Sequence, residues 1–187
     1  MSSLASLTGL LTLDAGFAGP AAPLACRVEQ ELRFSDDARA VEVARFRPLT
    51  LGPLGGDTLA VSFEGGGAGH HDPASGAIEL WIRLRFACLR PARRKAASFL
   101  TLRLATGEAP SPGRGLPPLT GTPVQPDGAV TLVAASIFEK QGLDGHACTV
   151  RIAGRLWPAR AAAPGLAFST RRLPGSPAPG CRTWSAA

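Results

Sequence analysis

One stretch of the chain alternates between apolar and polar side chains without interruption. It is AIELWIRLRFAC, residues 77–88, and its apolar positions are Ile78, Leu80, Ile82, Leu84, Phe86 and Cys88. The positions between them hold Glu79, Trp81, Arg83 and Arg85. A period of two is typical of a β-strand that buries one face, because successive side chains of a strand point to opposite sides. This stretch therefore predicts a strand with an apolar inner face and a polar outer face.

The same pattern returns along the chain and predicts seven further strands. They cover residues 4–13, 26–34, 39–46, 58–63, 99–104, 129–138 and 147–157. Turn-forming residues lie between several of them, such as Asp72-Pro73-Ala74-Ser75-Gly76. No long run has the apolar spacing of three and four that a helix needs, so we expect little helix. Eight strands joined mostly by short turns predict an all-β domain of antiparallel strands, either a barrel or a two-sheet sandwich.

Two segments lack the alternation. Residues 106–128 are rich in proline and glycine and predict a long loop, and residues 158–187 predict an extended or disordered basic tail. We therefore expect one domain over residues 1–157. A chain of 187 residues with 45% hydrophobic and 18% charged residues is long and apolar enough for one domain with a core.

Positive charge is concentrated in the predicted tail. The formal net charge is +6, and four of these charges come from Arg160, Arg171, Arg172 and Arg182, because residues 158–187 contain no acidic residue. The remaining body carries only about +2, which does not indicate a nucleic-acid-binding protein.

Cysteine usage bears on the compartment. Cys26, Cys88 and Cys148 share the phase of the apolar residues around them, which indicates small buried hydrophobic side chains. Cys181 lies in the tail, and the spacing of the four cysteines matches no metal-binding pattern. This pattern favours a reducing cytoplasm.

The first residues are apolar but do not form a convincing secretory leader. They lack a positively charged start, and Asp14 interrupts the apolar run. We interpret residues 4–13 as a first strand, with export as the alternative. No apolar stretch reaches the length of about 18 residues typical of a membrane-spanning helix, so we expect no such span.

The densest group of chemically active side chains is His70-His71-Asp72. Neighbours on a strand point to opposite faces, so the two histidines should diverge, and Asp72 suits the start of a turn. A weak metal or proton-transfer site is the alternative. No nucleophile elbow, phosphate loop or paired acidic motif is present, so we expect no catalytic residue, no metal and no cofactor.

Six residues suggest an interaction face. Trp81, Arg83 and Arg85 lie on the outer face of the best strand, and Arg103, Arg151 and Arg155 face outward on later strands. If these strands are neighbours, the arginines form one basic face that could bind an acidic protein or another polyanion. Trp81 is the only aromatic residue near them, so the stacking platform of single-strand nucleic-acid binders is missing. An ordinary solvated face, balanced by glutamates, is the alternative.

The segment 129–138 is apolar on both sides, because Val133, Ala135 and Ile137 occupy the outer face. A strand with two apolar faces is normally covered on both. The cover is either the long loop of this chain or another subunit.

These patterns favour a non-enzymatic β-domain that acts in protein–protein association or as a structural assembly component. Its partner would be another protein or a second copy. The alternative is a β-barrel that binds a small apolar ligand, with Ala134, Ser136 and Gly154 leaving room inside. The stretch SIFEKQGLDG resembles turn patterns of eight-stranded barrels of the allene oxide cyclase and dirigent kind, but this similarity is short and assigns no residue a role.

Overall fold

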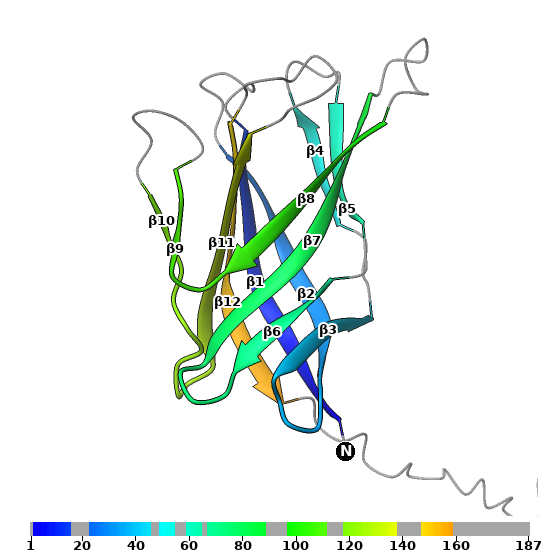
Figure 1. The fold of residues 1–187 in the computed structure, drawn as a ribbon. Coiled ribbons are helices and arrows are strands. Elements are labelled where there is room, and N and C mark those ends of the chain that lie inside the picture. Colours follow the sequence, from blue (N-terminus) through cyan, green and yellow to red (C-terminus); the bar gives the residue numbers. More distant parts are fainter. Residues whose placement is uncertain are drawn as a thin grey trace, which may run out of the picture.

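The fold is a closed barrel of antiparallel β-strands, as a computed structural model of the chain shows (Figure 1). The structure describes residues 2–15, 23–45, 49–54, 59–64, 67–88, 97–111, 118–137 and 147–158. Within these ranges it contains strands and turns but no helix. The predicted all-β class is therefore confirmed, and the barrel is the form that it takes.

Ten strands make up the main sheet. They are β1 (Ser3–Ala15), β2 (Leu24–Phe34), β3 (Ala40–Arg45), β4 (Leu49–Leu54), β5 (Leu59–Glu64), β6 (Ala68–Asp72), β7 (Ala77–Cys88), β8 (Ala97–Ala105), β11 (Ala129–Ile137) and β12 (Ala147–Pro158). Two short strands, β9 (Glu108–Ala109) and β10 (Leu119–Thr120), pair with each other in a second sheet.

The strands follow one another around the barrel in chain order. β5 pairs with residues 83–88 of β7 and β6 pairs with residues 77–80, so β5 and β6 together occupy one position of the barrel. β3 and β4 share the next position, because β3 pairs with β6 and β4 with β5. The barrel therefore has eight positions. β1 pairs with β12 along its length, and β8 meets β11 at Ala105 and Val133.

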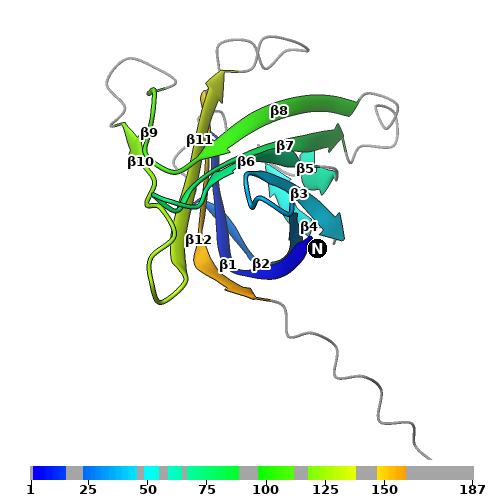
Figure 2. The ribbon, with the colours of Figure 1, turned by 60° about the horizontal axis from the view of Figure 1, so that its bottom comes forward.

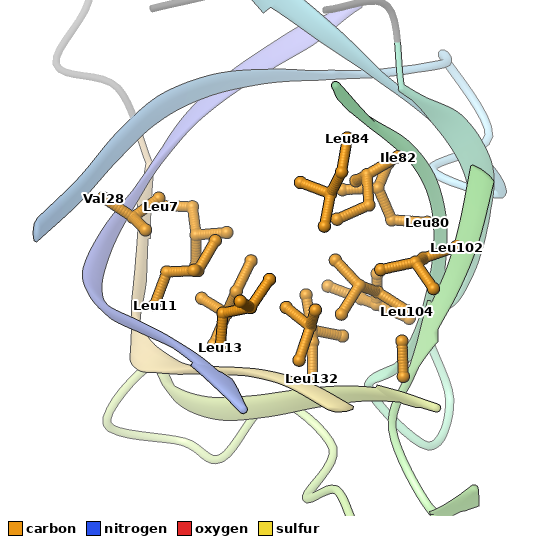
Figure 3. Close-up of a cluster of buried hydrophobic side chains, with 14 of the residues drawn as sticks. Leu7, Leu11, Leu13, Val28, Leu80, Ile82, Leu84, Leu102, Leu104 and Leu132 are labelled. Atoms are coloured by element: carbon orange, nitrogen blue, oxygen red, sulfur yellow. The ribbon is translucent and has the colours of Figure 1, made fainter. Parts of the chain in front are cut away.

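The inside of the barrel holds the apolar side chains that the alternation predicted. The inward residues of β7 are all at most 3% exposed, and they are Ile78, Leu80, Ile82, Leu84 and Phe86. They meet leucines of β1, β8 and β11 in the barrel interior (Figure 3). Because a buried side chain of this size contributes about 1.5–3 kcal/mol to stability, the interior cluster is the main source of folding free energy.

Four strands were not predicted from the sequence. β4 contains Gly52 and Pro53 and has a register shift between Thr50 and Gly52. β6 contains Gly69, where a Cβ atom would overlap the backbone of Glu79 on β7, so glycine is required for the close approach of the two strands. β9 and β10 lie in the segment that was predicted to be a loop.

The cysteine side chains behave as small hydrophobic residues where the structure describes them. Cys148 is fully buried, and Cys26 is half-buried against the core. Burial, with a smaller contribution from the charge of Asp14, raises the pKa of the Cys148 thiol to about 12. Such a thiol has little thiolate at neutral pH and is chemically inert. The side chain of Cys88, and Cys181 as a whole, lie outside the described part.

No helix in the described ranges is long and apolar enough to span a membrane. Of the predicted tail, residues 158–187, the structure describes only Pro158, which ends β12.

Candidate functional site

Two neighbouring strands carry large exposed aromatic side chains on their outer faces. Trp81 of β7 is 47% exposed, and Phe99 of β8 is 46% exposed. The antiparallel register places Trp81 opposite Arg103, and Arg85 opposite Phe99. We call the outward side chains of Trp81, Arg83, Phe99 and Arg103 the Trp81 face.

Glu79 organises one end of the Trp81 face. Arg103 Nη2 donates to Glu79 Oε2 at 2.6 Å. The hydrogen bond from Arg103, followed by the charge of Arg103, holds the pKa of Glu79 below its usual range. The ionised carboxylate of Glu79 therefore orders the guanidinium group of Arg103, although the Arg103 side chain remains exposed.

The other end of the face is held by an arginine–aromatic contact. The guanidinium carbon of Arg83 lies 4.1 Å from the centre of the Phe99 ring, a cation–π geometry. The neighbouring Arg85 pairs with Glu64 of β5 at 3.4 Å. Side chains that are already ordered lose less conformational entropy when a partner binds. The Trp81 face is thus prearranged for contact.

The structure divides the six predicted interaction residues into two groups. Arg151 and Arg155 lie on β12, and strands β8 and β11 separate β12 on that side from β7. Arg155 pairs with Asp127 at 3.4 Å and lies over the ring of Trp157 at 5.7 Å. These two arginines therefore do not extend the Trp81 face. The sequence could not reveal this, because the order of strands around a barrel is not visible in their alternation.

Ion pairs neutralise much of the positive charge on these strands. Arg85, Arg103 and Arg155 each face a carboxylate, while Arg83 lies on an aromatic ring. A surface of this kind offers few uncompensated guanidinium groups, so it gives little support to a polyanion as the ligand.

The histidine cluster lies on β6, and its two rings point in different directions. His71 packs edge-on against Phe34 at a centroid distance of 5.1 Å, and its Nδ1 lies 2.7 Å from the carbonyl oxygen of Ala38. His70 lies exposed on the outer side, opposite Glu79 of β7. The two rings thus have different partners, although both histidines line the groove described below.

Asp72 takes part in the turn that follows β6. It accepts hydrogen bonds from the Ser75 hydroxyl and from the Ala74 backbone N–H, and these hold its pKa below the usual range. Among the residues that the structure describes, no group of three or more His, Cys, Asp or Glu side chains is placed to hold a metal ion.

An open groove lies next to the Trp81 face, where β9 leaves the barrel beside β6 and β7. Its volume is about 420 Å³. The charged groups along it are those of Asp72, Glu79, Glu108 and Arg103, and its apolar wall includes Ala109 and Pro110. Sequence reasoning missed this groove because one wall is β9, inside the predicted loop. Arg103 belongs to the groove and to the Trp81 face, so the two features adjoin.

The apolar outer side of β11 is covered at one place by the chain itself. Val133 is only 1% exposed although its cross-strand partner is the exposed Arg151 and it lies outside the interior cluster. The β9–β10 pair contacts β11 and lies away from the barrel interior (Figure 2). Ile137, four residues further along the same face of β11, is 42% exposed. Self-covering therefore accounts for Val133, while Ile137 and Trp81 stay open.

Comparison of the chain with protein-family models, with curated proteins and with solved structures finds no match.

Proposed function

We propose that this protein is a non-enzymatic interaction domain, which associates with a second copy of itself through the Trp81 face. The observation that carries the proposal is the exposure of two large aromatic side chains on neighbouring strands, Trp81 at 47% and Phe99 at 46%. An exposed tryptophan and an exposed phenylalanine next to ordered arginines have the composition of a protein–protein hot spot.

Two further features support association over the binding of a small apolar ligand inside the barrel. The hollow lined by Leu7, Leu11, Val28 and neighbouring inward side chains measures about 10 Å³, which is no more than the space for one water molecule. Gly154 faces the backbone of Thr8 and Gly9 so closely that a Cβ atom would overlap them. This glycine therefore serves the approach of β1 and β12 and does not enlarge a ligand cavity.

The test is the native mass of the full chain over a wide range of protein concentrations. We expect the wild-type mass to rise from that of one chain as the concentration increases. The double variant Trp81→Ser/Phe99→Ser should remain at the mass of one chain, because it removes both aromatic contacts.

Trp157→Ser is the matched control, because Trp157 is 45% exposed but lies on β12, outside the Trp81 face. This variant should associate like the wild type. The proposal is wrong if the wild type stays a single chain at every concentration, or if Trp157→Ser abolishes association as fully as the double variant does.

A further inference from the structure

The edge of β8 that faces β11 is open along most of its length. Within the described residues, β8 pairs with β11 only at Ala105 and Val133. If the pairing continued in the same register, Thr101 would lie opposite Ile137, yet both side chains are exposed. The two strands diverge from their meeting point in both views of the barrel (Figures 1 and 2). Away from this point, β8 has only β7 as a neighbour among the described strands.

Backbone hydrogen-bonding groups point out of this open edge. The N–H of Thr106, directly after β8, donates to Ile78 O of β7 at 2.9 Å. In an antiparallel pair, alternate residues turn both their N–H and their C=O toward the same neighbour. The even-numbered residues of β8 therefore face β7, and Phe99, Thr101 and Arg103 turn these groups toward the open edge. Such a row of backbone groups is a template for a further strand.

β8 lacks the features that protect strand edges from other chains. At the other end of the sheet, β4 pairs only with β5 among the described strands, and it contains Pro53 and a register shift after Thr50. Prolines and irregularities of this kind prevent pairing with a foreign strand. The sequence of β8, ASFLTLRLA, has neither proline nor glycine, and Arg103 is its one charged residue. Its edge is therefore competent to pair.

The outward residues of β8 are complementary to themselves in an antiparallel pair. If Thr101 lies opposite Thr101 of a second copy, Phe99 of each copy lies opposite Arg103 of the other. The same relation exists within one chain, where the register places Phe99 opposite Arg85 and Arg103 opposite Trp81. Pairs of threonines and contacts between arginine and an aromatic ring are favourable. A register centred on Arg103 would instead place two arginines opposite each other, which is destabilising.

We infer that two copies pair their β8 edges in antiparallel orientation about Thr101, so that β7 and β8 of both copies form one continuous sheet. This inference rests on the proposed self-association and specifies its geometry. The pairing covers residues 99–103, because the edge at Ala105 already pairs with β11. Arg103 then lies between Trp81 of its own chain and Phe99 of the second copy. The Trp81 faces of the two copies thus become one surface.

A proline at the centre of the edge tests the backbone pairing. Thr101→Pro removes an N–H that points to the open edge and leaves the hydrogen bonds to β7 in place, so the chain should fold. Each pair of copies loses two hydrogen bonds, and the dissociation constant should rise roughly hundredfold. Thr101→Ala is the matched control, because it keeps the N–H and should associate nearly as tightly as the wild type. Native mass over a range of protein concentrations measures all three.

A disulfide at the same position tests the register. Residues that exchange hydrogen bonds across an antiparallel pair have Cα atoms ~5.5 Å apart, which is within the range of a disulfide. In a chain with Cys88→Ala and Cys181→Ala, Thr101→Cys should therefore cross-link two copies under mild oxidation. Arg151→Cys is the control, because Arg151 is also exposed but lies on β12. Its cross-linking should be at least roughly tenfold slower, since these cysteines are too far apart in the proposed pair.

Two results would overturn the inference. One is a folded Thr101→Pro variant that associates as tightly as Thr101→Ala. The other is cross-linking of Thr101→Cys that is no faster than that of Arg151→Cys. If the wild type associates in these experiments, the proposed self-association stands and only the edge pairing fails. A wild type that stays a single chain at every concentration contradicts the proposed function itself.

Discussion

Val133 and Trp81 are both apolar residues on the outer surface of the barrel, yet they end in opposite environments. Val133 is 1% exposed beneath the β9–β10 pair, whereas Trp81 is 47% exposed. Outward positions are expected to be polar, and both residues depart from this expectation. The alternation along their strands therefore does not distinguish Val133 from Trp81. The difference teaches that an apolar outward residue marks a covered surface only when the chain supplies the cover. Where the chain leaves it open, a partner becomes the better explanation.

The largest expected effect comes from placing a charge at the covered position. Val133→Asp should lower the free energy of unfolding by about 3–5 kcal/mol, because it buries a carboxylate without a partner. Ile137→Asp is the control, since Ile137 lies on the same face of the same strand at 42% exposure. It should cost about 1 kcal/mol or less. Chemical denaturation measures both, and equal losses would contradict the covering of Val133.

A smaller effect is expected at the open position. Trp81→Ser should change the free energy of unfolding by about 1 kcal/mol or less, because exposed cross-strand contacts contribute little. The same variant should reduce association strongly when paired with Phe99→Ser. A loss of stability as large as that of Val133→Asp would show that Trp81 is a core residue. It would contradict the description of Trp81 as part of an open surface.

The smallest effect is a pH dependence at Glu79. The hydrogen bond from Arg103 lowers the pKa of Glu79 in the folded chain, so its contribution to stability is fully present above the usual glutamate range. This contribution is lost as the pH falls through the lowered pKa. In a chain with Trp157→Phe and Trp184→Phe, the fluorescence of Trp81 should change in this acidic range. Glu79→Gln should abolish that transition, and a transition that survives would mean that another group controls Trp81.

Much of the fold was predictable because a strand that buries one face alternates between apolar and polar residues in the sequence. β7 spans Ala77–Cys88, the same residues that the alternation indicated. β4 was not predicted because Gly52, Pro53 and a register shift interrupt its alternating pattern. β6 was not predicted because, with Gly69, it has too few apolar positions to indicate a buried face.

The candidate site was predictable only in part. The exposed character of Trp81 and Arg83 follows from their phase on β7. The separation of Arg151 from them depends on which strands are neighbours, and that is a property of the closed barrel. The contacts of Glu79 and the groove could not be predicted from the sequence. They join residues of β6, β7, β8 and β9, which are brought together only by the fold.

The pairing of β1 with β12 brings together the first and the last of the described strands. During synthesis on the ribosome, the edge of β1 that faces β12 has no partner until β12 has been made. The hairpins between β1 and β12 can assemble earlier as an open sheet, but the barrel can close only after β12 has been made. Unpaired strand edges invite pairing with other chains, so the nascent protein is most vulnerable to aggregation just before the ring is completed.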